Sequence, residues 1–294
     1  MKRCLQLLTL FVAALGAALA QVPAGAKYRV PFGASGESHT PQILYHGGPI
    51  LLGSVPIYIV YYGSFQSSTV QIVNDFFSNL GGSPPFAVNT TYYDAQGNFI
   101  SGALSFSPAS SVYFDSYSQG KIVTSGTVLK ILAGALNGHL PIDTTAEYFL
   151  ITSPDVKVIG FCRSFCAYHN NSGSIVAGKD IKYALVPDPD SACYGCDGNV
   201  SIYNQNVTPN GDIGADEMTD SIMHELSETV TDPDINAWYT RLGEEVADLC
   251  NFKYGTTYTA PNGAIANAHL GNRDYLIQTI WENKNAGFCA NTLQ

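Results

Sequence analysis

Positively charged residues are scarce in this sequence. The chain of 294 residues has 14 lysines and arginines against 24 aspartates and glutamates. Lys2 and Arg3 belong to an N-terminal segment that we expect to be removed, which leaves 12 basic and 24 acidic residues and a formal charge of −12. This charge argues against nucleic acids and anionic membrane surfaces as partners.

The sequence also lacks internal repeats, low-complexity tracts and, beyond its N-terminus, any apolar run long enough to span a membrane. A purely structural wall protein therefore fits poorly. At the N-terminus, Lys2 and Arg3 precede a nearly continuous apolar run from Leu5 to Leu19, and Ala18-Leu19-Ala20 has the small-x-small pattern of a cleavage site. We predict that residues 1–20 are a signal peptide and that the protein is secreted and extracellular.

The rest of the chain is predicted to form one domain. Residues 21–44 are rich in glycine, proline and serine and are predicted to form an extended arm. Residues 45–294 contain no linker, and a mature chain of about 270 residues can bury one sizeable core. Four glycosylation sequons predict a glycoprotein; they begin at Asn89, Asn170, Asn199 and Asn206.

Cysteine is present in an even number once Cys4 leaves with the signal peptide. The remaining cysteines are Cys162, Cys166, Cys193, Cys196, Cys250 and Cys289. An even number in a secreted chain predicts disulfides, with Cys250 and Cys289 as one pair and the connectivity of the other four left open. Those four could instead form a thiolate zinc site, which the oxidising compartment disfavours.

The pattern of apolar residues predicts an α+β domain. Predicted strands lie at residues 55–62, 90–94, 110–114, 147–152, 156–161, 181–186 and 275–281. Predicted helices follow Ser68, span Thr127 to Leu136 and follow Asp212. This order is expected of a zincin-like fold, in which a mixed β-sheet packs on helices; here the loops would be tied by disulfides.

The most informative stretch is the helix predicted before Asp232-Pro233. His224 and Glu228 lie four residues apart and therefore on one side of this helix, and Glu225 follows His224 directly. The resulting His-Glu-x-x-Glu pattern differs by one residue type from the His-Glu-x-x-His of zinc peptidases. A half-buried helix without metal can carry the same short pattern by chance.

In zinc peptidases the residues at i and i+4 bind the metal, and the intervening glutamate is the general base for the attacking water. The sequence therefore predicts His224 and Glu228 as zinc ligands, Glu225 as the catalytic base, and either Glu245 or Asp248 as the third ligand. Two carboxylates around one histidine form a harder donor set than most zinc sites have, so manganese and calcium stay open as alternatives. Asp232 is disfavoured as the third ligand because it lies eight residues from His224, about 12 Å along the helix axis.

Three further sites have weaker signals. His169 could be another metal ligand, although a loop histidine beside a disulfide is the favoured interpretation. Asp212 and Asp216 could help bind calcium, but turn and capping roles suffice. His46 and Trp281 are assigned to packing.

An ordered series of segments resembles the phosphate-induced protein 1 family, which includes the plant EXORDIUM proteins. The segments are Tyr45-His46-Gly47-Gly48-Pro49, residues 55–63, Phe161 to His169, Pro209 to Gly214, Asn236-Ala237-Trp238-Tyr239, Ala247-Asp248-Leu249-Cys250 and the strand ending at Trp281. The resemblance spans roughly residues 40–290 and implies a secreted, apoplast- or wall-associated protein linked to growth and nutrient response. It supplies no catalytic residues, and many plant members look to have lost the His-Glu-x-x-Glu helix that this chain retains.

Two functions follow as hypotheses. The first is a secreted, zinc-dependent hydrolase of the peptidase type that uses the His224–Glu228 helix. The second is a non-catalytic secreted protein that binds a peptide or a glycan in a groove against Trp238 and Tyr239, since aromatic faces bury well while their polar ends hydrogen-bond. The sequence does not fix the oligomeric state.

Overall fold

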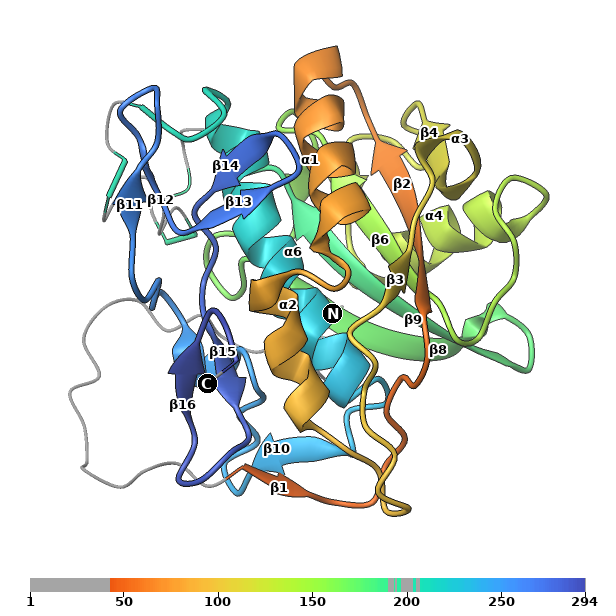
Figure 1. The fold of residues 1–294 in the computed structure, drawn as a ribbon. Coiled ribbons are helices and arrows are strands. Elements are labelled where there is room, and N and C mark those ends of the chain that lie inside the picture. Colours follow the sequence, from red (N-terminus) through yellow and green to blue (C-terminus); the bar gives the residue numbers. More distant parts are fainter. Residues whose placement is uncertain (1–42, 190–192, 194, 197–202, 205–206, 294) are drawn as a thin grey trace, which may run out of the picture.

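A mixed β-sheet forms the centre of the protein (Figure 1). The structure is a computed structural model that describes residues 43–189, 193, 195–196, 203–204 and 207–293. The predicted signal peptide and the predicted arm up to residue 42 lie outside these residues. The sheet consists of β3 (Leu104–Ser105), β2 (Val55–Tyr62), β6 (Glu147–Thr152), β9 (Lys179–Pro187) and β8 (Tyr168–Val176) in that order, with β4 (Val112–Asp115) also paired to β2. All pairs are parallel except the one between β8 and β9, so β8 is an antiparallel edge strand.

Helices cover both faces of this sheet (Figure 1). In β2, Ile57, Ile59 and Tyr61 belong to one apolar core, whereas Val60 and Tyr62 belong to another. The first core also contains residues of α1 (Ser67–Leu80) and α6 (Ile213–Thr231), and the second contains residues of α4 (Ser125–Leu136). Because both faces are covered, the central strands appear in the sequence as continuous apolar runs rather than as alternating ones.

Smaller elements complete the domain. Five antiparallel or parallel pairs join β1 (Ile43–Tyr45) to β10 (Trp238–Thr240), β5 (Ile122–Val123) to β7 (Lys157–Val158), β11 (Tyr258–Thr259) to β12 (Ile265–Ala266), β13 (Ala268–Leu270) to β14 (Arg273–Tyr275), and β15 (Ile280–Glu282) to β16 (Phe288–Ala290). Short helical turns are α2 (Pro84–Ala87), η1 (Val88–Thr91), α3 (Pro108–Ser111) and η3 (Asp248–Cys250). Strand β15 packs against η1 and η3.

Helix α6 is the predicted central helix, and it is enclosed by the rest of the protein. The Asp212 side chain caps its first turn by accepting a hydrogen bond from the Ala215 amide at 3.0 Å. The helix ends at Thr231, directly before Asp232-Pro233, as the sequence predicts. Every residue from Gly214 to Thr231 is buried, so the charged side chains of this helix must find partners inside the protein.

Several predicted elements are confirmed and others are wrong. The strands at 55–62 and 147–152 and the helices after Ser68 and Thr127 are present, although Gln66 and Thr124 are the respective N-caps. Residues 88–91 form η1 instead of a strand, because β-branched and aromatic residues favour strands only where a sheet offers them a place. The strand predicted at 156–161 shrinks to β7 and pairs with β5, and the one predicted at 275–281 is divided between β14 and β15. The long strand β8 was not predicted, because its sequence is mainly polar.

The six predicted disulfide cysteines are paired. The bridges are Cys162–Cys193, Cys166–Cys196 and Cys250–Cys289. The last pair was predicted, and the first two settle the connectivity that the sequence left open. Paired sulfurs are not thiolates, so the alternative of a four-cysteine zinc site is wrong for this structure.

One predicted glycosylation site conflicts with the fold. Asn89 is fully buried, and its side-chain amide donates a hydrogen bond to the Ser227 hydroxyl at 3.1 Å. A glycan cannot be accommodated there, so this prediction is wrong. Asn170 is partly exposed on β8, and the sequons at Asn199 and Asn206 lie outside the described residues.

Candidate metal centre

Helix α6 brings the three residues of the His-Glu-x-x-Glu pattern to the interior. Glu228 follows His224 by one helical turn, and its Oε1 lies 3.2 Å from His224 Nε2. Glu225 is also buried, with 3% of its surface exposed. The predicted helical spacing of these residues is therefore present, in a setting that excludes most solvent.

The segment after α6 returns to the same place with two more carboxylates. It turns at Asp232, whose Oδ1 accepts hydrogen bonds from the amides of Asn236 and Ala237 at 2.5 and 2.6 Å. Asp248 then lies beside the helix, with its Oδ1 3.7 Å from His224 Nε2 and its amide donating to Glu228 Oε1 at 3.1 Å. Glu245 is held next to Asp248, because its amide donates to Asp248 Oδ2 at 3.0 Å.

His169 reaches this cluster from the edge strand β8. It is 1% exposed, and its Nε2 lies 3.3 Å from Glu245 Oε1 and 3.7 Å from Glu228 Oε2. Side chains alternate along a strand, so Ala167 and His169 both face α6, whereas Tyr168 faces the opposite core. The interpretation of His169 as a loop residue is wrong. In the sequence, the alternation expected of side chains along a strand at Ala167-Tyr168-His169 was the one signal that could have placed His169 on the side of α6.

Gln278 fixes the orientation of the His224 ring. Its side-chain nitrogen donates to the Ala247 carbonyl at 3.0 Å, so its Oε1 must be the atom that faces His224 Nδ1, also at 3.0 Å. His224 Nδ1 therefore carries the proton and donates it to Gln278. Nε2 is then the atom that faces Glu228 and Asp248, where either a metal ion or a proton can lie between the nitrogen and the carboxylates.

Asp220 in turn holds Gln278 in place. Its Oδ1 accepts a hydrogen bond from the backbone amide of Gln278 at 2.6 Å, and its Oδ2 accepts one from the Tyr254 hydroxyl at 3.2 Å. A histidine whose second nitrogen donates to a fixed acceptor is the usual arrangement around metal ligands. The sequence alone gave no signal for Gln278, because it lies in the irregular segment between β14 and β15.

The cluster is negatively charged and almost closed to solvent. The side chains of His169, His224, Glu228, Glu245 and Asp248 are between 0% and 8% exposed. Burial opposes the protonation of His169, but the carboxylates of Glu245, Glu228 and Glu225 outweigh it and raise its pKa to about 10. The electrostatic field at this position therefore strongly favours a positive charge.

The pKa values of two neighbouring acids, Asp232 and Glu147, are also raised. Burial, followed by the charge of Glu245, raises the pKa of Asp232 to about 7. Burial also raises the pKa of Glu147 well above its usual range, with a further contribution from Glu225, even though the Thr229 hydroxyl donates to Glu147 at 2.8 Å. Both acids thus take up protons readily, as expected where anionic groups crowd together.

The distances around His224 can be compared with two kinds of contact. A direct charge-assisted hydrogen bond brings nitrogen and oxygen to about 2.7–2.9 Å. Two ligands of one tetrahedral ion at bond lengths of about 2.1 Å lie roughly 3.4 Å apart. The observed 3.2 and 3.7 Å from His224 Nε2 to Glu228 and Asp248 match the second case better. The donor set fits a divalent ion, and both the binding of an ion here and its identity as zinc stay predictions.

The structure also shows the roles of the other residues that the sequence singled out. Asp212 caps α6, and Asp216 accepts both the amide and the side chain of Asn210, at 2.9 and 2.7 Å, so their turn and capping roles are sufficient. Trp281 is buried in the first core, as predicted. Trp238 is 3% exposed and packs against Tyr45, Tyr92 and Tyr93, so it cannot line an open groove as predicted.

His46, near the start of the described chain, pairs with Tyr239 after α6. His46 stacks on Tyr239 with ring centroids 3.7 Å apart, and its Nε2 lies 3.1 Å from the Tyr239 carbonyl oxygen. His46 thus has the packing role that was predicted.

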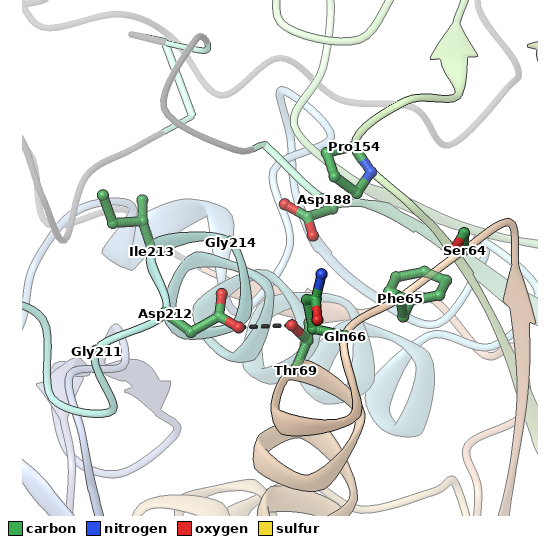
Figure 2. A pocket seen from close by; sticks show the side chains of 10 residues that line it. All are labelled: Ser64, Phe65, Gln66, Thr69, Pro154, Asp188, Gly211, Asp212, Ile213 and Gly214. Carbon is green, nitrogen blue, oxygen red and sulfur yellow. Dashed lines mark hydrogen bonds between the residues drawn. The ribbon is translucent and has the colours of Figure 1, made fainter.

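A pocket of about 380 Å³ lies at the other end of α6 (Figure 2). It opens beyond the carboxyl ends of β2, β6 and β9, where the N-termini of α1 and α6 meet; its lining residues are Ser64, Phe65, Gln66, Thr69, Pro154, Asp188, Gly211, Asp212, Ile213 and Gly214. Gly214 lies close to Asp188: a Cβ atom at this position would lie 2.1 Å from Asp188 Oδ1, so a larger residue would displace the Asp188 side chain. The lining contains none of the cluster residues.

Comparisons with known proteins agree with the resemblance seen in the sequence. The chain is 30% identical to Protein EXORDIUM-like 3 of Arabidopsis thaliana, over 84% of this chain and 82% of that protein. It is 28% identical to Protein PHOSPHATE-INDUCED 1 of Nicotiana tabacum, over 84% of this chain and 87% of that protein. No solved structure matches the chain, so no known fold supports the zincin-like part of the prediction beyond its mixed α+β architecture.

Two structural findings bear on the predicted location. The three disulfides are consistent with an extracellular protein. Among the described residues, no helix has the length and apolar character needed to cross a membrane. The sequence model described as "Phosphate-induced protein 1 conserved region" matches residues 43–291, and the chain therefore belongs to the phosphate-induced protein 1 family.

Proposed function

We propose that this protein is a secreted, metal-dependent hydrolase of the peptidase type, in which His224, Glu228 and Asp248 hold a divalent ion. The observation that carries the proposal is the fixed tautomer of His224. Its Nδ1 donates to Gln278, so its Nε2 is the atom that faces two carboxylate oxygens. These atoms converge in a buried site where a shared cation offsets the negative charge, and we assign that cation as a divalent ion rather than a proton on Nε2.

The chemistry assigned to each residue follows from its position. A bound divalent ion would polarise a scissile carbonyl and make a water molecule more acidic. Glu225 is the base that accepts a proton from that water, whose oxygen attacks the carbonyl carbon. When the carbon–nitrogen bond breaks, Glu225 returns the proton to the leaving amine. The helix containing these residues would then be zincin-like in function, with Glu228 in place of the second histidine.

The effect of Glu225 on its neighbours supports this role. Its negative charge lies close enough to raise the pKa values of His169 and Glu147. Glu225 is near the ligands and belongs to neither of the two donor groups, which suits the role of a base better than that of a ligand.

The test separates catalysis from metal binding. Glu225→Gln keeps the shape of the side chain but cannot accept the proton, so it should keep the ion and lose hydrolysis of peptide or ester libraries. His224→Ala should lose both. A Glu225→Gln protein that hydrolyses as fast as the wild type would refute the assignment of the base.

A second candidate function is non-catalytic binding of a peptide or a glycan, and two observations favour it. The cluster is nearly closed, as structural metal sites are, whereas catalytic sites keep an open position. The pocket in Figure 2 combines the apolar side chains of Phe65 and Pro154 with the polar groups of Gln66 and Thr69. Such a mixed lining suits a ligand that has both apolar faces and hydrogen-bonding groups.

Gln66 offers a mild way to test this second function. It is the N-cap of α1 but makes no side-chain capping bond, so Gln66→Ala should leave the fold intact. Under the binding hypothesis, this change weakens binding of wall oligosaccharides or peptides while Glu225→Gln does not. If neither ligand class binds the wild-type protein in calorimetric titration, the binding function is rejected.

A further inference from the structure

Glu228 presents its two oxygens to two different groups of donors. Oε1 faces His224 Nε2 at 3.2 Å, and Oε2 faces His169 Nε2 at 3.7 Å. Asp248 completes the first group and Glu245 the second, and the donor atoms within each group lie within 4.8 Å of one another. A carboxylate shared in this way is the usual bridge between two metal ions.

The geometry points to a dinuclear metal centre: Glu228 bridges one divalent ion held by His224 and Asp248 and a second one held by His169 and Glu245. This inference rests on the proposed metal site at His224 and adds the second position. Nitrogen and carboxylate oxygen donors in both groups suit zinc or manganese.

The spacing of the second group resembles that of the first. His169 Nε2 lies 3.3 Å from Glu245 Oε1 and 3.7 Å from Glu228 Oε2. Both distances exceed the roughly 2.7–2.9 Å of a charge-assisted hydrogen bond. They bracket the spacing of about 3.4 Å expected between two ligands of one tetrahedral ion.

The charge of the cluster favours more than one cation. Glu225, Glu228, Glu245 and Asp248 contribute four formal negative charges, of which a single divalent ion balances two, so a further cation is needed to balance the others. In the described parts of the chain, Lys182 is the one buried lysine or arginine, and it pairs with Asp180 and Asp234 instead. Two divalent ions neutralise the four carboxylates, and uncompensated buried charge is strongly unfavourable.

The two positions should differ in affinity. His224 Nδ1 donates to Gln278, whereas His169 Nδ1 has no hydrogen-bond partner among the described residues. Loss of such a supporting hydrogen bond typically weakens metal affinity by about 10–100-fold. The His224 position should therefore fill first, and the His169 position should bind about 10–100-fold more weakly.

The competing hypothesis is that a protonated His169 serves as the counter-charge for Glu228 and Glu245. The two hypotheses predict different numbers of metal ions bound per chain. Titration of the purified, metal-free full chain with Mn²⁺, followed by electron paramagnetic resonance, should show two ions per chain. The first should give the hyperfine pattern of isolated Mn²⁺, and the second should replace it with the broadened spectrum of a coupled pair.

The result that overturns the inference leaves the proposed function testable. One Mn²⁺ per chain with an uncoupled spectrum at saturation, together with one Zn²⁺ per chain by elemental analysis, refutes the second position but keeps the first. No binding of either ion refutes both the dinuclear centre and the proposed hydrolase.

Variants test which residues hold the second ion. His169→Ala and Glu245→Gln each remove one of its proposed ligands, from different elements of the fold, and each variant should retain one ion and lose the coupled spectrum. His269→Ala is the matched control, because this histidine is 62% exposed in its side chain and pairs with Asp274 away from the cluster; it should keep two coupled ions. If a folded His169→Ala or Glu245→Gln protein still binds a coupled pair, the assignment is overturned.

Discussion

The hydrogen bond between His224 and Gln278 offers the sharpest test of the first metal position. Gln278 is fully buried; its side chain accepts from His224 Nδ1 and donates to the carbonyls of Ala247 at 3.0 Å and Thr279 at 3.5 Å. Gln278→Leu removes these bonds without leaving a large cavity. The His224 ring then loses the contact that fixes its tautomer and orientation.

The size of the effect can be estimated from these contacts. Loss of the supporting bond to a metal-binding histidine should weaken metal affinity by about 10–100-fold, or about 1.4–2.7 kcal/mol. The Ala247 carbonyl keeps the Cys250 amide as a donor at 2.9 Å, so loss of the Gln278 bond should lower the free energy of unfolding by only about 0.5–1.5 kcal/mol. Gln278→Glu is the matched control, because it also loses the bond to Ala247 but keeps an acceptor for His224.

The assay is a competition titration of zinc between the purified protein and a chelator of known affinity, with thermal unfolding measured on the same samples. Gln278→Leu should bind zinc more weakly than the wild type and than Gln278→Glu. A folded Gln278→Leu protein with wild-type zinc affinity would show that His224 is not a metal ligand, and the central observation behind the proposed function would be lost.

Three further predictions concern stability and redox state. Replacing Cys250 and Cys289 together by serine opens a loop with a sequence separation of 39 residues, which should cost about 4 kcal/mol of unfolding free energy in the chain-entropy model; an unchanged denaturant midpoint would contradict this. Burial raises the pKa of Asp216 from 3.8 to about 6, so the native state binds the extra proton between these values and stability should fall by roughly 2 kcal/mol as the pH rises from 4 to 6. Asp216→Asn should flatten that part of a pH series of denaturant unfolding curves, and an equally steep curve for the variant would sink the assignment. Titration of the denatured, unreduced mature protein should find almost no free thiols, because all six of its cysteines are paired, and several reactive thiols would argue against the three bridges.

Local patterns determined the parts of the fold whose neighbours lie close in the sequence. The strands β2 and β6 were predictable because long runs of apolar and β-branched residues are buried on both faces. Helix α6 was predictable from its four-residue period and from Asp232-Pro233 at its end. This period also placed His224 and Glu228 on one side, since helical geometry fixes that spacing whatever surrounds the helix.

Tertiary structure decided which residues join these two. His169 and Glu245 are 76 residues apart, and His224 and Gln278 are 54 apart, so no local period relates them. The sequence offered Glu245 and Asp248 as alternatives for one role, whereas the fold brings both to Glu228. The position of His169 depends on the pairing of the polar strand β8 with β9, in which a shift of one residue would turn its side chain to the opposite face. Sequence thus determined the helix that carries the motif, and the packing of the sheet edge and the C-terminal segments around it determined the charge, burial and donor set of the site.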